Sequence, residues 1–119
     1  MMGLTNNLRI FLALQPVDMR KSFNGLSIIA EQLIVGGLRG GALFVFTNKR
    51  RNHFKALYYD RTGVCVLAKR LEKGTFAWPS PSQPDQQQIT LTAEALHLLF
   101  DGVDLRGATL RPWYERDVK

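Results

Sequence analysis

Residues 42–71, ALFVFTNKRRNHFKALYYDRTGVCVLAKRL, decide the fold because they hold three strand-like runs separated by two short polar connections. The first run (42–47) is apolar and aromatic, the second (53–59) is rich in aromatic residues, and the third (64–71) is apolar before it turns basic. The connections 48–52 and 60–63 have the length and composition of hairpin loops. This stretch therefore predicts an antiparallel meander of three strands.

Other elements flank the meander on both sides. Residues 8–14 (LRIFLAL) predict a buried strand, and 79–88, rich in Pro, Ser and Gln, predict a loop. A helix capped by Asp18 is predicted over about residues 20–35, because apolar residues recur there at helical spacing. A second helix is predicted over 92–101, with Thr92 as its N-cap and Gly102 just past its end.

Together these elements predict an α+β fold, in which a mainly antiparallel β-sheet packs with two helices in a single domain. The 119 residues, 45% of them apolar, can build one hydrophobic core and leave no room for a second. The expected core spans about residues 8–105, and residues 106–119 resemble a tail.

The composition favours a cytoplasmic location and gives no sign of a membrane partner. Cys65 is the single cysteine, so no internal disulfide can form, and its place within a strand predicts a buried structural thiol. The N-terminus lacks the pattern of a signal peptide, and the longest purely apolar runs, such as ALFVF at 42–46, are far too short to span a bilayer.

Positive charge is concentrated in one part of the chain. The net charge is +6 and the pI about 9.9. Residues 1–80 carry twelve basic and four acidic side chains, a net charge of +8, whereas residues 81–119 carry four basic and six acidic ones, a net charge of −2. A basic region of this kind favours a polyanionic partner.

The meander predicts where these cations gather. The strand that leaves Val64 returns to the end of the sheet that carries the 48–52 loop. It would bring Lys69, Arg70 and Lys73 beside the Lys-Arg-Arg run at 49–51. Like charges this close repel one another unless an anion lies between them. Arg20 and Lys21 are expected in the first turn of a helix, where exposed N–H groups suit a phosphate.

Each of these features also has an ordinary structural explanation. The basic run at 49–51 could be a solvated hairpin tip, and Lys69 and Arg70 could protect an edge strand. Arg20 and Lys21 could simply be exposed. Phe76 and Trp78 could stack on unpaired bases, but they also suit a core.

No constellation for catalysis stands out, so we expect a protein that is not an enzyme and needs no cofactor. The phosphate-binding and nucleophile motifs are missing, and His53 and His97 are far apart without metal-ligand spacing, so no metal is expected. The carboxylates that could form a nuclease site each have a structural role as a cap, a turn or a helix end. The candidates are Asp18, Asp60, Glu72, Glu94, Asp101 and Asp104.

An ordered series of motifs over about residues 9–105 resembles a known family. The motifs are DMRKSFNGL at 18–26, LFVF at 43–46 before KRR at 49–51, KALYYD at 55–60, KRLEKG at 69–74, FAWP at 76–79 and LLFDGVD at 98–104. They resemble the small accessory protein, TnpB or Orf2, that insertion sequences of the IS-66 group encode. Asn24, Tyr59 and Leu105 depart from the family pattern, which has an acid at the first position and commonly Trp at the others.

The resemblance implies a bacterial, nucleoid-associated accessory protein for transposition, working beside a separate transposase that carries out cutting and joining. The implied partners are that transposase and DNA, which could be the element ends or DNA of any sequence. A homo-oligomer is left open. An adaptor that docks the transposase and a metal-dependent nuclease using Asp18 and Asp60 remain as alternatives. The basic residues that we predict to bind nucleic acid, all of them within these motifs, are Arg20, Lys21, Lys49, Arg50, Arg51, Lys55, Lys69, Arg70 and Lys73.

Overall fold

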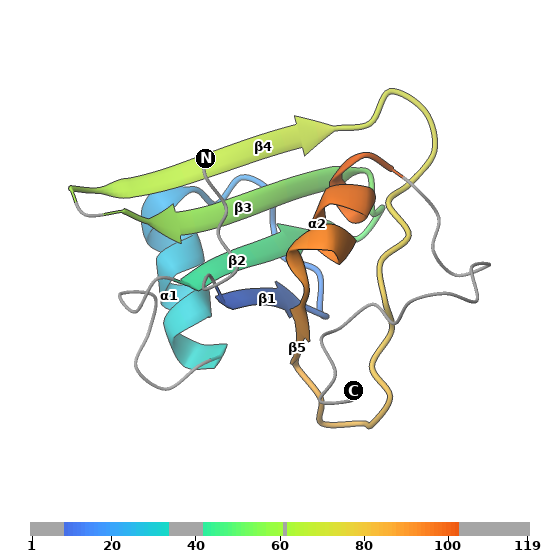
Figure 1. Ribbon diagram of the computed structural model, residues 1–119, viewed down its shortest axis with the longest axis horizontal. Coiled ribbons are helices and arrows are strands. Elements are labelled where there is room, and N and C mark those ends of the chain that lie inside the picture. Colours follow the sequence, from blue (N-terminus) through green and yellow to red (C-terminus); the bar gives the residue numbers. More distant parts are fainter. Residues whose placement is uncertain (1–8, 34–41, 61, 103–119) are drawn as a thin grey trace.

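A five-stranded sheet lies between two helices in the computed structural model, which describes residues 9–33, 42–60 and 62–102 (Figure 1). The strand order is β4-β3-β2-β1-β5. The α+β prediction with a mainly antiparallel sheet is therefore confirmed. The elements are β1 (Arg9–Ala13), α1 (Phe23–Leu33), β2 (Ala42–Thr47), β3 (His53–Tyr59), β4 (Val64–Arg70), β5 (Gln88–Leu91) and α2 (Ala93–Phe100).

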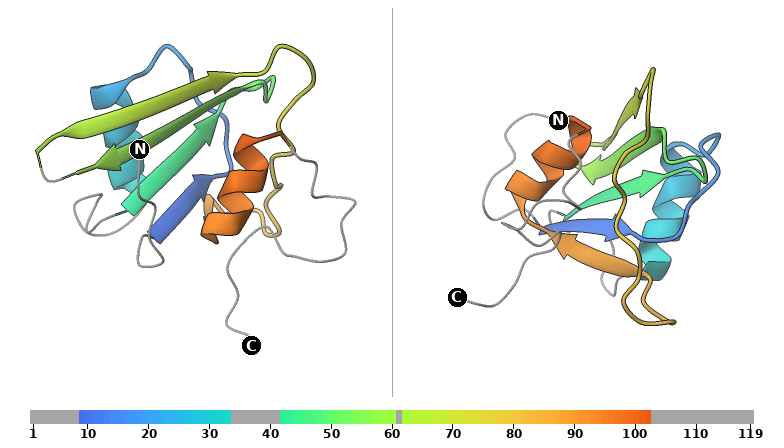
Figure 2. Two further views of the ribbon diagram at one scale, coloured as in Figure 1. Left: turned by 45° about the horizontal axis from the view of Figure 1, so that its top comes forward. Right: turned by 90° about the vertical axis from the view of Figure 1, so that its right-hand side faces the viewer.

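Strands β2, β3 and β4 form the predicted meander, joined by the two predicted hairpins. Strand β1 runs parallel to β2, a pairing that needs the crossover supplied by the segment containing α1. Strand β5 pairs antiparallel with β1 at the far edge. As a result β1, β2 and β4 end, and β3 and β5 begin, at one end of the sheet. We call this end the rim, and it faces the viewer in the right-hand view of Figure 2.

Helices cover the two faces of the sheet separately, so the molecule has three layers (Figure 2). On the α1 side, Leu26 and Ala30 pack against Phe44 and Phe46. On the α2 side, the helix packs over the opposite face of the same strands. Strand β2 is buried along its whole length because both of its faces are covered, which explains its unbroken apolar sequence.

Helix α1 is shorter than predicted. It begins at Phe23 instead of residue 20 and ends at Leu33, and residues 34 and 35 of the predicted helix lie outside the described part of the chain. Asp18 does not cap the helix, because it accepts hydrogen bonds from the backbone N–H and the guanidinium of Arg20 in a turn that precedes it. The prediction that Arg20 and Lys21 occupy the first helical turn is therefore wrong.

The segment between β4 and β5 crosses the rim and closes the core on the α2 side. Phe76 and Trp78 are both 1% exposed, so the suggestion that they stack on nucleic-acid bases is wrong. The indole N–H of Trp78 donates to the carbonyl of Ala13 at 2.9 Å. Residues 79–87 form the predicted loop, but Gln88 already belongs to β5, a strand that the sequence did not indicate.

Helix α2 follows the prediction closely. Thr92 is its N-cap, since its hydroxyl accepts the N–H of Ala95 at 3.0 Å, and Gly102 has the positive φ of 84° that suits a residue just past a helix end. Neither described helix is long and apolar enough to cross a membrane. Leu105 and the expected tail at 106–119 lie outside the described residues.

Candidate nucleic-acid interface

The hairpin loop between β2 and β3 is held in one conformation by Asn48. Its side-chain oxygen accepts the backbone N–H groups of Asn52 and His53, each at 3.1 Å, and its amide donates to the side chain of Asn52 at 2.8 Å. Arg51 has a positive φ of 60°, which lets the chain reverse direction within this short loop. The loop therefore presents Lys49 and Arg50 outward from a fixed frame.

We predict that Asn48→Ala destabilises this loop and the domain together. The substitution removes three hydrogen bonds and leaves two loop N–H groups to find water, which should cost about 1–3 kcal/mol of unfolding free energy. Urea unfolding followed by circular dichroism measures the change. Asn24→Ala on the exposed surface of α1 is the control and should change stability by no more than about 0.5 kcal/mol. Equal unfolding midpoints for the two variants would show that Asn48 does not hold the loop.

A second basic segment, residues 15–22, lies beside this loop. The N–H of Val17 donates to the carbonyl of Thr47 at the end of β2, which ties the segment to the rim. The Lys55 ammonium donates to the carbonyls of Met19 and Lys21, both at 2.8 Å. These contacts bring Arg20 and Lys21 to the α1 side of the rim, where both side chains are exposed.

Arg20 forms an ion pair with Asp18, with Nη2 and Oδ2 2.7 Å apart. Hydrogen bonds from the side chain and the backbone of Arg20 lower the pKa of Asp18 to about 2. Because both side chains are exposed, this pair contributes little to stability and is accessible to an incoming anion.

The third basic segment follows the end of β4. Arg70 is the cross-strand partner of His53, and the N–H of Leu71 donates to the carbonyl of Asn52 at 2.9 Å. The N–H of Phe76 donates to the carbonyl of Arg51 at 2.6 Å, so the bend that carries Lys73 lies against the hairpin loop. The two hairpins thus bring the 48–52 loop and the segment after β4 together, and the hydrogen bonds of Val17 and Lys55 hold segment 15–22 beside them.

The nine predicted residues divide into two groups. Arg51, Lys55 and Lys69 are half-buried and form hydrogen bonds within the protein. Arg51 donates to the carbonyl of Trp78 at 3.4 Å, and Lys55 donates to the two carbonyls named above. Lys69 donates to the carbonyl of Phe100 at 2.8 Å, and its ammonium lies over the Phe100 ring. These three stabilise the fold. The other six are exposed, and we call them the rim cations: Arg20, Lys21, Lys49, Arg50, Arg70 and Lys73.

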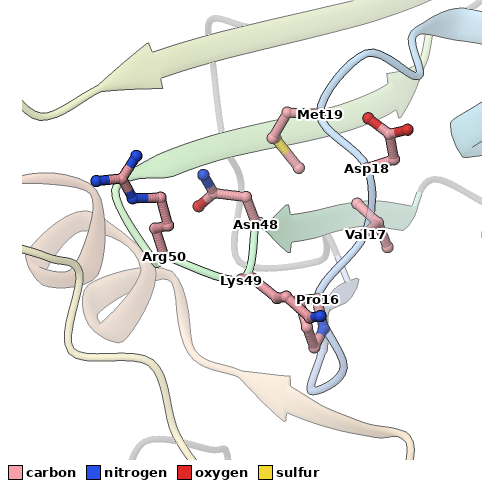
Figure 3. Close-up of a pocket in the computed structure, with 7 residues that line it drawn as sticks. All are labelled: Pro16, Val17, Asp18, Met19, Asn48, Lys49 and Arg50. Carbon is pink, nitrogen blue, oxygen red and sulfur yellow. The ribbon is translucent and has the colours of Figure 1, made fainter.

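An open pocket of about 440 Å³ lies between the first two basic segments (Figure 3). Lys49 extends toward Pro16 and Arg50 turns away from residues 16–19 (Figure 3), while the Asn48 side chain turns into its own loop toward Asn52 and His53. The lining combines apolar side chains with two cations at the mouth. Such a surface can accept a phosphate at its edge and the apolar part of a sugar or base beside it.

Sequence reasoning missed His53 as a member of this surface. It is the first residue of β3 and lies opposite Arg70, and burial together with the charges of Arg70 and Lys55 lowers its pKa below the ordinary value. The signal was available, because the 48–52 loop places residue 53 at the start of the next strand.

Asp18 and Asp60, the two carboxylates named as nuclease metal ligands, do not come together, and Asp104 lies outside the described residues. Asp18 lies at the rim, whereas Asp60 follows β3 at the opposite end of the sheet, where it accepts the N–H groups of Thr62 and Gly63, both at 2.8 Å. These hydrogen bonds lower the pKa of Asp60. Among the described residues, no group of three or more His, Cys, Asp or Glu could hold a metal ion.

Cys65 differs from the prediction of a buried thiol. It lies half-exposed on edge strand β4, and its sulfur is 3.5 Å from Oδ2 of Asp60. Desolvation and the neighbouring Asp60 carboxylate raise the pKa of Cys65, so the thiol stays protonated at neutral pH.

The fold and the rim define a small α+β protein with a cluster of exposed cations at one end of its sheet. The chain matches the family described as "IS66 Orf2 like protein" over residues 8–109, and it therefore belongs to that family. It is 31% identical over 112 residues to the uncharacterized protein y4jC of Sinorhizobium fredii, which covers 94% of this chain and 93% of the relative. The uncharacterized protein y4hO of the same organism is 31% identical over 100 residues, or 84% of each chain. No solved structure matches.

Proposed function

We propose that the rim cations bind the phosphate backbone of DNA while the protein acts as an accessory factor in transposition. Membership of the IS66 Orf2 like family supports the accessory role in transposition of an insertion sequence. The single observation that supports DNA as the ligand is the gathering of six exposed cations from three chain segments at one end of the sheet. A polyanion relieves the mutual repulsion of these charges, and a nucleic-acid backbone supplies phosphates at regular spacing.

The contacts that hold the three segments favour binding without large rearrangement. Asn48, Lys55 and Lys69 make internal hydrogen bonds that fix the backbone under the rim cations. A surface fixed in this way loses little conformational entropy when it binds, apart from the side-chain freedom of the cations themselves. The contacts that the rim cations would make with DNA are to phosphates, which carry no sequence information directly. We therefore propose that the protein binds element-end DNA and random DNA with similar affinity.

This proposal predicts a steep dependence of DNA affinity on salt. If all six rim cations contact phosphates, a plot of log affinity against log salt concentration should have a slope of about −5. Fluorescence anisotropy of a labelled 20-base-pair duplex, titrated at several NaCl concentrations, measures the slope. A slope between zero and about −1, or no binding even at low salt, would contradict the proposal.

A protein–protein adaptor is the second candidate function, and two exposed side chains of α1 favour it. Phe23 is 50% exposed and Ile28 is 58% exposed, and both lie on the helix that follows the basic segment 15–22. Exposed large apolar side chains beside cations suit a protein partner such as the transposase. The test is a pull-down of the transposase with and without nuclease treatment. Capture that survives the nuclease, and that is lost in the double variant Phe23→Ser with Ile28→Ser, would support this function over DNA binding.

A further inference from the structure

His53 and Arg70 form a pair on the α1 side of the rim. They are opposite one another in the β3–β4 ladder, and paired residues of an antiparallel ladder point to the same face of the sheet. Lys55, two residues further along β3, shares that face with Leu57, which belongs to the cluster under α1. The imidazole therefore lies between an exposed guanidinium and a half-buried ammonium.

The imidazole of His53 is free to accept a new ligand. The backbone N–H of this residue donates to Asn48 and its carbonyl accepts the hydroxyl of Thr47, but its ring makes no hydrogen bond within the described part of the chain. Lys55 is already committed to the carbonyls of Met19 and Lys21. A ligand at this point would thus be met by the guanidinium of Arg70 and by a ring nitrogen of His53.

The charged groups nearest the ring are cations. Burial first, then the charges of Arg70 on β4 and Lys55 on β3, lower the pKa of His53. The segment before α1 brings Arg20 and Lys21 to the same side of the sheet, and its carboxylate, Asp18, is occupied by Arg20. Beyond β4, Glu72 and Lys73 lie exposed in the bend that follows Arg70. Burial and these cations disfavour the protonated ring, and a bound anion would offset them.

We infer that His53 and Arg70 form a proton-linked phosphate subsite, in which protonated His53 donates a hydrogen bond to a backbone phosphodiester of the bound nucleic acid. This inference rests on the proposed function, and it adds to it a titratable contact. The guanidinium of Arg70 can offer two parallel N–H groups to the same phosphate. The protein then takes up one proton as it binds.

Proton uptake fixes the direction of the pH dependence. A phosphate beside the ring raises the pKa of His53, so affinity increases as pH falls through the bound-state value and levels off below the free-state value. The carboxylates of Asp18 and Asp60 do not interfere, because their pKa values are lowered and they remain ionised above pH 5. His53 and His97 are the two histidines of the chain, and histidine is the side chain whose unperturbed pKa lies between pH 5 and 8.

The test is DNA affinity measured by anisotropy between pH 5.5 and pH 8.0 at constant ionic strength, on wild type, His53→Gln and His97→Gln. His97 lies exposed on α2, so His97→Gln is the matched control. Wild type and His97→Gln should bind about five-fold more tightly at pH 5.5 than at pH 8.0. His53→Gln should vary by less than about two-fold over the same range.

A second readout keeps the inference testable if His53→Gln folds poorly. The imidazole C–H signals of wild type, assigned with His97→Gln, are titrated by NMR with and without a 20-base-pair duplex. The pKa of His53 should rise on adding DNA. An equal pKa with and without DNA, or a pH dependence that persists in His53→Gln, overturns the subsite. Loss of all DNA binding at every pH would instead overturn the proposed function.

Discussion

Reversing the charge of Lys49 and Arg50 together should lower DNA affinity by about 100-fold at physiological salt. The two side chains project from the tip of the hairpin loop and have no acidic partner among the described residues. Glutamate at both positions removes two phosphate contacts and adds two repulsive charges at the centre of the rim. Arg51 is left unchanged in this test, because its guanidinium bonds to the carbonyl of Trp78 and its backbone has a positive φ.

The control for this variant carries the same change in net charge away from the rim. Arg9→Glu combined with Gln32→Glu and Thr62→Glu also removes four positive charge units, and all three positions are exposed. It should bind DNA within about three-fold of wild type, because distant surface charges are screened. Similar losses of affinity in the two variants would mean that overall charge, and not the rim, governs binding. Circular dichroism establishes that both variants are folded.

Replacing Trp78 with alanine should destabilise the domain by about 4 kcal/mol. The side chain is 1% exposed, closes the core on the α2 side, and packs edge-on against Phe54 with ring centroids 6.2 Å apart. Its indole N–H also satisfies the carbonyl of Ala13 at the end of β1. Small domains have unfolding free energies of about 5–15 kcal/mol, so this loss is a large fraction of the total.

Two further variants separate the causes of this loss in urea unfolding. Trp78→Phe keeps most of the ring packing and loses the N–H, so it should cost about 1–2 kcal/mol. Phe23→Ala removes a half-exposed aromatic ring from α1 and should cost less than about 1 kcal/mol. An unfolding midpoint of Trp78→Ala equal to that of wild type would refute the packing described for this end of the core.

The meander could be predicted because its signals are local. Alternating apolar runs and short polar loops identify β2, β3 and β4, and the hairpin register then fixes which basic residues meet. The parallel pairing of β1 with β2 could not be predicted, because no local signal states where a strand docks after a crossover. Strand β5 was missed because its four residues, QITL, follow a proline-rich loop and include two polar side chains.

The roles of the individual cations depended on contacts between distant residues. Lys55 forms hydrogen bonds to carbonyls more than thirty residues earlier in the chain. Lys69 forms a hydrogen bond to the carbonyl of Phe100, which is also more than thirty residues away. No spacing rule reveals such partners, so all the basic residues looked equivalent in the sequence. The sequence placed Arg20 in a helix because Asp18 resembles a helix N-cap, but Arg20 and Asp18 form their ion pair in a turn before α1.

The most direct test of DNA binding at the rim is a map of the backbone amides that shift on adding DNA, recorded by ¹H–¹⁵N NMR on the labelled protein. The largest changes should fall in three segments, residues 17–22, 48–53 and 69–74, while β5 and the 79–87 loop remain unchanged. Changes centred on that loop or on α2, with the hairpin tip unaffected, would contradict the account.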